Sequence, residues 1–512
     1  MHYFSTRGGD SRLSFEETVL AGLAPNGGLY IPSSIPTLPE NWQTQWESLS
    51  FTELALEIYS LYIPITEISR NELAELINRS YSTFSHPSIA PIRTLDPTTS
   101  VLELWHGPTF AFKDVALQFL GNLFEFFLAR KNSTRQHKQR ITVVGATSGD
   151  TGSAAIYGLR GKKDVSIFIL HPKGRVSPIQ EAQMTTVLDS NVFNLAVEGT
   201  FDDCQDIVKS LFSDAEFKES YQLGAINSIN WARILAQIVY YFSSYFELRK
   251  HAKLNHRIQY VVPTGNFGDI LAGFYAFKMG LPMGSEDGSC PGLVIATNAN
   301  DILTRLVKNG GVKETLSPAM DILVSSNFER LLFYLALDTL TTSERSEEDK
   351  IRKSQAQVNQ WMQELKTNGK FVVPTETLQL AKQIFVAGRA SDEDTCETIR
   401  LHFEREGDRY IVDPHTAVGL FVAKTQKSVN PLNMIQLVLA TAHPAKFSEA
   451  VQKGISASKG FNEFDFEKDV LPNEFKGLLE KPKKIIEVNG IEDWKTQEIV
   501  VREVKRLFGE SN

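Results

Sequence analysis

The chain has 512 residues, of which 42% are hydrophobic and 22% charged, and its formal net charge at pH 7 is −8. These values are typical of a globular protein with a large core and about three domains. The acidic balance argues against a nucleic-acid-binding face, and no apolar run is long enough to span a membrane.

The cysteines and histidines indicate neither disulfides nor a metal site. Cys204, Cys290 and Cys396 are too few and too far apart for a disulfide framework or a paired-cysteine zinc site. The ten histidines are scattered, without a His-Glu-x-x-His run. The opening MHYFSTRGGD lacks the apolar run of a signal peptide, so we expect a cytoplasmic protein and treat the sequons at Asn78 and Asn132 as chance.

The first hundred residues predict helices joined by loops. Ser14 and Glu17 have capping-box spacing at the start of a helix over 14–23. Helical periodicity returns at 51–63 and 67–81, and the prolines between 87 and 97 are typical of a linker.

From residue 100 onward the pattern alternates between strands and helices. Short runs rich in Val and Ile predict seven strands, at 101–105, 141–145, 165–170, 193–197, 258–262, 293–296 and 435–440. A dense apolar helix is expected at about 114–130. Such uninterrupted runs are typical of parallel strands covered on both faces, so the expected fold class is α/β.

The region 340–400 breaks this alternation and predicts an insertion. It contains a charged surface helix over 343–365 and an acidic stretch, 390–397, that we interpret as a loop. An amphipathic helix is expected in the final segment, 480–508.

Lys113 is the first candidate for chemistry. It lies in the apolar run Phe110–Ala116 at the start of a helix. Partial desolvation and the positive end of the helix dipole both favour the neutral amine that Schiff-base chemistry needs. The alternative is a lysine whose stem packs on phenylalanines while its head reaches water.

Two loops between a strand and a helix could bind anions. One is TSGDTG at 147–152, and the other is TGNFGD at 264–269. Each exposes backbone N–H groups at a helix N-terminus, where phosphates and carboxylates bind. Each could equally be a tight turn with a helix cap.

Two further segments follow strands. The segment VLATAHPAKF presents Thr441 at a strand end, as a neutral partner for a ring nitrogen or as a helix cap. Because ligands of α/β sheets bind at the carboxyl ends of strands, this segment and the two loops should face one crevice. Lys173 and Arg175 surround Gly174 after another strand, where they could bind an anionic substrate or form a solvated turn.

Together, FKD, SGDTG, TGNFGD and ATAHPAKF resemble the threonine synthase family of fold-type II, tryptophan synthase β-like, pyridoxal-phosphate enzymes. The opening YFSTRG…SFEETVLAGLAPNGGLYIP, TNANDIL at 297–303 and DPHTAVG at 413–419 also fit, in the family's order. The resemblance implies open, mostly parallel sheets in two domains, an N-terminal helical domain and an inserted helical region. The expected parts are an N-terminal domain (1–97), a large cofactor domain (98–139 and 226–460, with an insertion at about 310–400), a small α/β domain (140–225) and a C-terminal segment (461–512).

The resemblance also implies roles for individual residues. Lys113 would carry pyridoxal 5′-phosphate, and Thr441 would meet its pyridine nitrogen. The cofactor's phosphate would be held by Gly265, Asn266, Phe267, Gly268 and Asp269. The substrate's carboxylate or phosphate would be bound by Thr147, Ser148, Gly149, Asp150 and Thr151, with Lys173 and Arg175 as candidates for the phosphate. Many relatives have Asn in place of Asp150, which leaves the partner of the cofactor's 3′ oxygen unassigned.

The implied reaction converts O-phospho-L-homoserine and water to L-threonine and phosphate. A phospholyase releasing 2-oxobutyrate, ammonia and phosphate is the alternative on the same scaffold. A non-catalytic phosphate-ligand sensor is a third hypothesis, which the intact Lys113 disfavours. The long insertion is similar to the fungal and bacterial branch, which implies no adenosylmethionine activation and a monomer or weak dimer.

Overall fold

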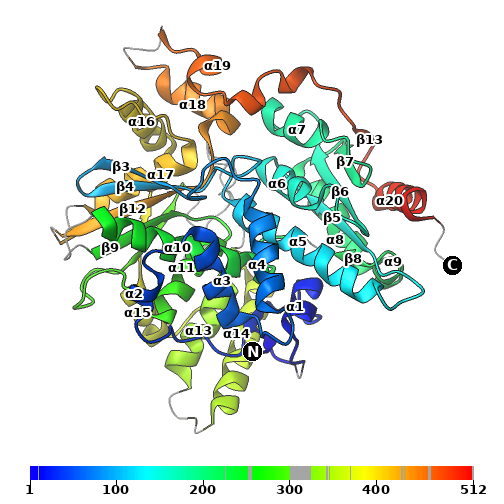
Figure 1. Cartoon of the computed structure of the whole chain (residues 1–512), viewed down its shortest axis with the longest axis horizontal. Coiled ribbons are helices and arrows are strands. Elements are labelled where there is room, and N and C mark those ends of the chain that lie inside the picture. The colour runs from blue at the N-terminus through cyan, green and yellow to red at the C-terminus, as the bar shows by residue number, and fades with distance from the viewer. Residues whose placement is uncertain are drawn as a thin grey trace.

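The structure is a computed structural model of the whole chain. It describes every residue except 10, 225, 252–256, 300–324, 342–343, 345, 370, 428–429, 432, 459–462 and 510–512, and it leaves the side chains of Asp150 and His251 undescribed. Two sheets lie on either side of the molecule, and helices α5 (Lys113–Asn132) and α6 (Asp150–Leu159) pack against each other between them (Figure 1).

The larger sheet has six strands in the order β11-β10-β9-β12-β4-β3. All neighbours are parallel except β3 and β4. The strands are β3 (Ile92–Asp96), β4 (Thr99–Glu103), β9 (Arg257–Pro263), β10 (Leu293–Thr297), β11 (Phe385–Arg389) and β12 (Met434–Ala440).

Both faces of this sheet are covered, which explains the uninterrupted apolar runs. Along β12, Leu437 and Leu439 face the core formed with α5, α10 (Trp231–His251) and α11 (Gly268–Met279). Val438 and Ala440 alternate with them and face α16 (Asp392–Phe403), α17 (Pro414–Gln426) and α18 (Ser448–Ile455).

The smaller sheet has five parallel strands in the order β13-β7-β6-β5-β8. They are β5 (Ile141–Ala146), β6 (Val165–Pro172), β7 (Val192–Val197), β8 (Leu223–Gly224) and β13 (Ile486–Val488). The C-terminal segment therefore adds an edge strand, and the predicted amphipathic helix follows as α20 (Asp493–Phe508).

The N-terminal region joins helices to a two-stranded sheet. Its elements are β1 (Tyr3–Ser5), α1 (Phe15–Ala21), β2 (Tyr30–Pro32), α2 (Trp42–Trp46), α3 (Phe51–Tyr62) and α4 (Arg70–Tyr81). The predicted capping box of Ser14 and Glu17 is present at the start of α1. Among the described residues, the remaining helices are α7 (Pro178–Thr185), α8 (Phe201–Ser213), α9 (Ala215–Ser220), α13 (Phe328–Leu340), α14 (Glu347–Asn368), α15 (Thr375–Ile384), α19 (Phe466–Asp469) and the short 3-10 helices η2 (Pro444–Phe447), η4 (Asn473–Phe475) and η5 (Leu478–Glu480).

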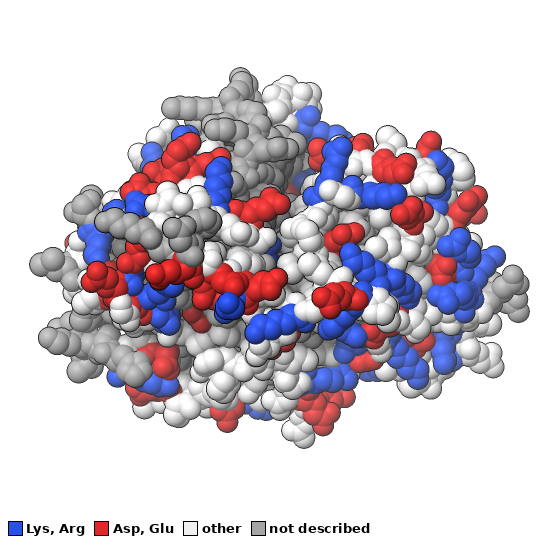
Figure 2. Space-filling view, turned by 90° about the horizontal axis from the view of Figure 1, so that it is seen from above, with Lys and Arg blue, Asp and Glu red and all other residues white. Residues whose placement is uncertain are grey.

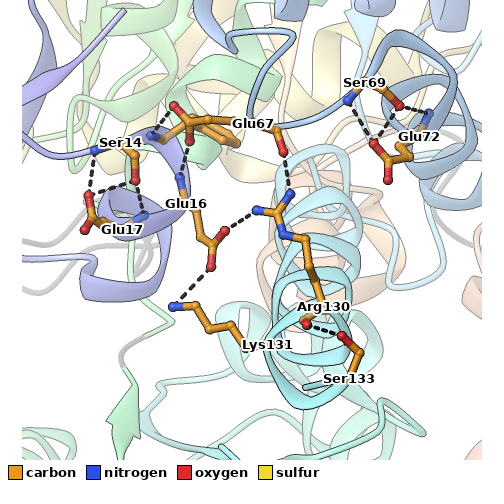
Figure 3. A network of polar contacts seen from close by, with 10 residues as sticks. Ser14, Glu16, Glu17, Glu67, Ser69, Glu72, Arg130, Lys131 and Ser133 are labelled. Atoms are coloured by element: carbon orange, nitrogen blue, oxygen red, sulfur yellow. Dashed lines mark hydrogen bonds and ion pairs between the residues drawn. The ribbon is translucent and has the colours of Figure 1, made fainter. Parts of the chain in front are cut away.

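A polar network fixes the C-terminal end of α5 to this region (Figure 3). The Glu67 carboxylate accepts hydrogen bonds from the backbone N–H groups of Phe15 and Glu16, at 3.1 and 3.0 Å. Arg130 donates to Glu67 O and pairs with Glu16, and Lys131 Nζ lies 3.1 Å from the same Glu16 carboxylate. The helix that begins at Lys113 is thus anchored at its far end.

Most predicted elements are confirmed, and two interpretations are wrong. The seven predicted strands are present, with ends shifted by at most two residues. The predicted linker contains strand β3, and the predicted acidic loop at 390–397 is the first half of α16, where Ser391 forms a capping box with Asp394. Acidic residues in a first helical turn favour the helix because they face its positive end.

The predicted insertion does not lie wholly outside the core. The expected charged surface helix is α14. Strand β11, however, completes the edge of the larger sheet by pairing with β10. The part of the insertion from 310 to 324 lies outside the described residues, as do residues 300–303 of TNANDIL.

Candidate active site

Lys113 is placed by an antiparallel contact with the segment that follows β12. The backbone N–H of Phe112 donates to Thr441 O at 2.8 Å, and that of His443 donates to Phe110 O at 3.0 Å. Lys113 is the first residue of α5, so these bonds hold the start of that helix beside Thr441.

The Lys113 amine reaches the other sheet. Its Nζ donates to Thr151 Oγ1 at 2.8 Å, and Thr151 lies in the first turn of α6 after β5. The motifs expected to share a crevice therefore come from two different sheets, and the 147–152 loop meets the start of α5 where Lys113 and Thr151 touch.

The 147–152 loop is shaped by its own first residue. Thr147 Oγ1 accepts hydrogen bonds from the N–H groups of Gly149 and Gly152, at 3.0 and 2.9 Å. Gly149 has φ 151°, and a Cβ there would lie 2.2 Å from Gln180 Oε1, so only glycine fits. The Thr147 hydroxyl is thus hydrogen-bonded within the loop, whereas Ser148 is exposed.

The 264–269 loop fits a phosphate. Phe267 has a left-handed φ of 61°, and α11 begins at Gly268 without a side-chain cap. The N–H groups of the first turn therefore face a position where an anion satisfies them. The Phe267 ring packs against Phe328 and Phe385, which leaves its backbone for the ligand.

The carboxyl group of Asp269 faces away from such an anion. It accepts hydrogen bonds from the hydroxyls of Tyr240, at 2.5 Å, and Tyr241, at 3.1 Å. Burial raises the pKa of Asp269 to about 7, and the two tyrosines partly oppose the shift. Only its backbone N–H is thus suited to the phosphate role implied by the sequence.

Residues that the sequence did not single out hold the 264–269 loop. Asn327 donates from both its backbone N–H and Nδ2 to Asn266 O, each at 3.1 Å. Arg330 is fully buried, and its guanidinium donates to Asn327 Oδ1, Ile229 O and Tyr30 O. Burial lowers the pKa of Arg330 to about 10. In the sequence, the signal for this role is a single arginine, Arg330, within the apolar helix that starts at Phe328.

Arg233 was also missed. It is 3% exposed and lies in the first turn of α10. Gln237, one helical turn later on the same face, has its Oε1 3.7 Å from the position of a Cβ on Gly268. A buried cation therefore lies on the face of α10 that packs toward the 264–269 loop.

Lys173 and Arg175 are not brought to Lys113. Lys173 is exposed and pairs with Glu487 at 3.1 Å and Glu198 at 3.7 Å. Glu487 is the main cause that raises the pKa of Lys173. Arg175 is exposed, and the pKa of Asp203 is lowered mainly by hydrogen bonds from Thr200, with a smaller effect of the Arg175 charge. Both positive charges therefore interact with carboxylates near the edge of the smaller sheet.

Within the described ranges, no cluster of three or more His, Cys, Asp or Glu side chains could hold a metal ion. No helix in that part of the chain is both long enough and apolar enough to cross a membrane. Acidic and basic side chains are interspersed over the face seen from above (Figure 2).

Comparison with known proteins agrees with this geometry. Family models match at residues 2–81 (Threonine synthase N terminus), 101–434 (Pyridoxal-phosphate dependent enzyme) and 416–501 (Threonine synthase, C-terminal). The chain is 53% identical to a threonine synthase of Schizosaccharomyces pombe, over 94% of each chain. It is 52% identical to that of Saccharomyces cerevisiae, over 96% of each.

Solved structures agree as well. The crystal structure of threonine synthase from yeast has a TM-score of 0.92 and 49% identity, and covers 99% of each chain. A structure of PLP-bound threonine synthase from Brucella melitensis has a TM-score of 0.84 and 39% identity, and covers 98% of this chain and 99% of that one. The chain therefore belongs to the threonine synthase family, and it is a fold-type II enzyme whose cofactor is pyridoxal phosphate.

Proposed function

We propose that the protein converts O-phospho-L-homoserine and water into L-threonine and phosphate. The contact between Lys113 Nζ and Thr151 Oγ1 carries this proposal. This contact brings the Lys113 amine, which is suited to bind the cofactor, next to the 147–152 loop, which is suited to bind an anionic substrate. The contact lies beside Thr441.

We infer the cofactor's place from Lys113, the 264–269 loop and Thr441. The uncapped N-terminus of α11, with the backbone of 265–269, would hold its phosphate. The hydroxyl of Thr441, at a strand end and 7% exposed, would meet the ring nitrogen without giving it a charge. When bound, pyridoxal phosphate supplies the electron sink that lets substrate carbons lose protons.

The chain's own residues would move and hold the protons. Lys113 Nζ, freed by the incoming substrate amine, would take the proton from the substrate's Cα and return it at the end. Thr151 Oγ1 would orient Nζ for both transfers. The first-turn N–H groups of α6, together with Ser148, would bind the substrate's carboxylate or phosphate.

We propose that Arg233 places a positive charge beside the phosphate held by the 264–269 loop. It is buried on the face of α10 that packs toward the 264–269 loop, where a desolvated guanidinium binds a phosphate strongly. Lys173 and Arg175 remain the candidates for the substrate's phosphate, although both are exposed and Lys173 is paired with carboxylates.

Product analysis of the holoenzyme with O-phosphohomoserine tests the reaction. We expect threonine and phosphate in equal amounts. Phosphate with 2-oxobutyrate and no threonine would instead make the protein a phospholyase. Absence of phosphate release would overturn the substrate assignment while leaving the cofactor assignment in place.

We also propose that the site lies between a large domain (98–139 and 226–460) and a small domain (140–225), with the other parts packed around them. We propose a monomer or weak dimer that acts in the cytoplasm without nucleic acid or membrane. The three cysteines support a reducing compartment, since none forms a disulfide. Light scattering after gel filtration tests the assembly state, and cell fractionation tests the compartment.

A further inference from the structure

The ammonium group of Lys446, in the segment after β12, is buried among three parts of the chain. Lys446 is 1% exposed. Its Nζ donates to Thr109 O at 2.8 Å, to Gln183 Oε1 at 2.8 Å and to Ser153 Oγ at 3.4 Å. These acceptors lie in the turn before α5, in α7 and in the first turn of α6. The function proposed above assigns no role to the side chains of these four residues.

Thr109 connects this cluster to the residue that follows Lys113. Thr109 O also accepts from Gln183 Nε2 at 3.2 Å. The N–H and Oγ1 of Thr109 donate to the two oxygens of Asp114, at 2.8 and 2.7 Å. Hydrogen bonds through Thr109 therefore connect Lys446 to the carboxylate of Asp114, the residue next to Lys113.

The cluster contains opposite buried charges. Asp114 is 0% exposed, and burial raises its pKa to about 6, while Thr109 and the positive charge of Lys446 oppose the rise. A buried ammonium is costly to desolvate, and removing one member of a buried pair leaves the other uncompensated. The arrangement of these groups is thus strongly specified.

Lys446 joins the two halves of the site. Thr109 and Lys446 follow strands β4 and β12 of the larger sheet, whereas Ser153 and Gln183 lie on helices that flank the smaller one. Ser153 is two residues beyond Thr151 in the same turn of α6. A bond that fixes this turn also fixes the hydroxyl that holds Lys113 Nζ.

We propose that Lys446 is a positioning residue, whose ammonium group locks α6 and α7 against the turn that precedes Lys113. Without it, the substrate loop and the amine lose their common geometry. The effect on turnover rests on the proposed function, but the lock itself is a property of the folded holoenzyme.

Steady-state kinetics of the holoenzyme with Lys446→Met gives the first test, because methionine has a similar length and no charge. We expect KM for O-phosphohomoserine to rise about tenfold and kcat/KM to fall by up to about 100-fold, with the visible band of the lysine-bound cofactor retained. Lys453→Met, an exposed lysine of α18, is the matched control. Partial misfolding would lower kcat and leave KM unchanged, so a KM equal to that of the control overturns the proposal.

Hydrogen exchange gives a second reading that needs no substrate. In Lys446→Met we expect faster amide exchange in both 107–114 and 147–155, and no change in the Lys453→Met control. Unchanged exchange would overturn the lock even if the wild-type enzyme makes threonine. A wild-type enzyme that makes no threonine would overturn the proposed function and leave this reading valid.

Gln183→Met serves if Lys446→Met does not fold. It keeps the lysine and removes the amide that bonds both Lys446 and Thr109. We expect the same two changes, with KM raised about threefold to tenfold. Wild-type values of KM and of exchange in this variant would contradict the lock.

Discussion

The backbone N–H of Phe112 donates a 2.8 Å hydrogen bond to the carbonyl oxygen of Thr441. This bond joins the residue before the candidate cofactor lysine to the residue after β12. Because Thr441 is also the proposed partner of the ring nitrogen, one backbone contact sets the spacing between the two ends of the cofactor's binding site.

Replacing Lys113 by alanine tests the central assignment. Lys113→Ala removes the amine, so we expect loss of both the visible absorbance of the lysine-bound cofactor and threonine formation. Spectroscopy and product analysis check this, with Lys366→Ala, an exposed lysine of α14, as the control. Turnover retained by Lys113→Ala would show that another group moves the protons.

Thr151→Val tests the contact between Lys113 and Thr151. Valine keeps the shape and removes the hydroxyl that accepts from Lys113 Nζ. Since a hydrogen bond to a charged or reacting amine is worth roughly 1.5–3 kcal/mol, we expect kcat/KM to fall about 10- to 100-fold. The cofactor should remain bound. Wild-type kinetics for this variant, matched by the exposed control Thr367→Val, would argue against a role in orienting Nζ.

The strands and the motif loops were predictable because their signals are local. A buried parallel strand is a continuous apolar run, and a glycine-rich turn before a helix identifies an anion-binding loop. What the sequence could not reveal is pairing between distant segments. The two loops follow strands of different sheets, and only the folded chain shows that Lys113, at the start of α5, contacts Thr151 at the start of α6.

The same reason explains why the sequence does not indicate some of the contacts around the site. Arg330 and Asn327 act through carbonyl groups far away in the chain, which leave no sequence pattern. The pairing of Lys173 with Glu487 also depends on a distant segment, since β13 of the C-terminal segment brings Glu487 beside it. Acidic charge alone predicts a loop at 390–397, whereas the capping box of Ser391 starts a helix there.

Asn327→Ala tests the hydrogen bonds by which Asn327 holds the 264–269 loop. The variant loses the Nδ2 bonds to Asn266 O and Ser228 O and removes an acceptor of buried Arg330. We expect cofactor affinity to fall by about tenfold or more, because the loop that holds the phosphate is no longer fixed. Titration of the apoenzyme with pyridoxal phosphate measures this. An unchanged affinity would mean that the loop keeps its shape without the Asn327 side chain.

Gly121→Ala tests the close packing of α5 on α6. A Cβ at Gly121 would lie 2.0 Å from the carbonyl oxygen of Gly158, so the helices must separate. We expect a loss of about 1–3 kcal/mol of stability, measured as a lower Tm. Gly145→Ala is the control, since its nearest atom would be Ile169 Cδ1 at 3.6 Å. Equal Tm values for the two variants would contradict the tight contact.

Asp269→Asn separates a structural carboxyl group from one that binds phosphate. The pKa of Asp269 is raised by burial from 3.8 to about 7, so the folded state keeps the proton after the unfolded state has lost it. The free energy of unfolding of the wild type should therefore fall as pH rises between these two values, by an amount on the order of 4 kcal/mol, and the loss is complete above the upper one. Asparagine does not titrate, so the variant should lack this slope and gain stability relative to the wild type as pH rises.

Denaturation curves across that pH range measure the difference, and cofactor titration supplies the second readout. The carboxyl faces Tyr240 and Tyr241, so Asp269→Asn should bind pyridoxal phosphate with wild-type affinity. Parallel stability curves would contradict the burial argument. A large change in cofactor affinity would instead mean that the Asp269 carboxyl group contributes to phosphate binding, because the substitution changes that group and leaves the backbone N–H in place.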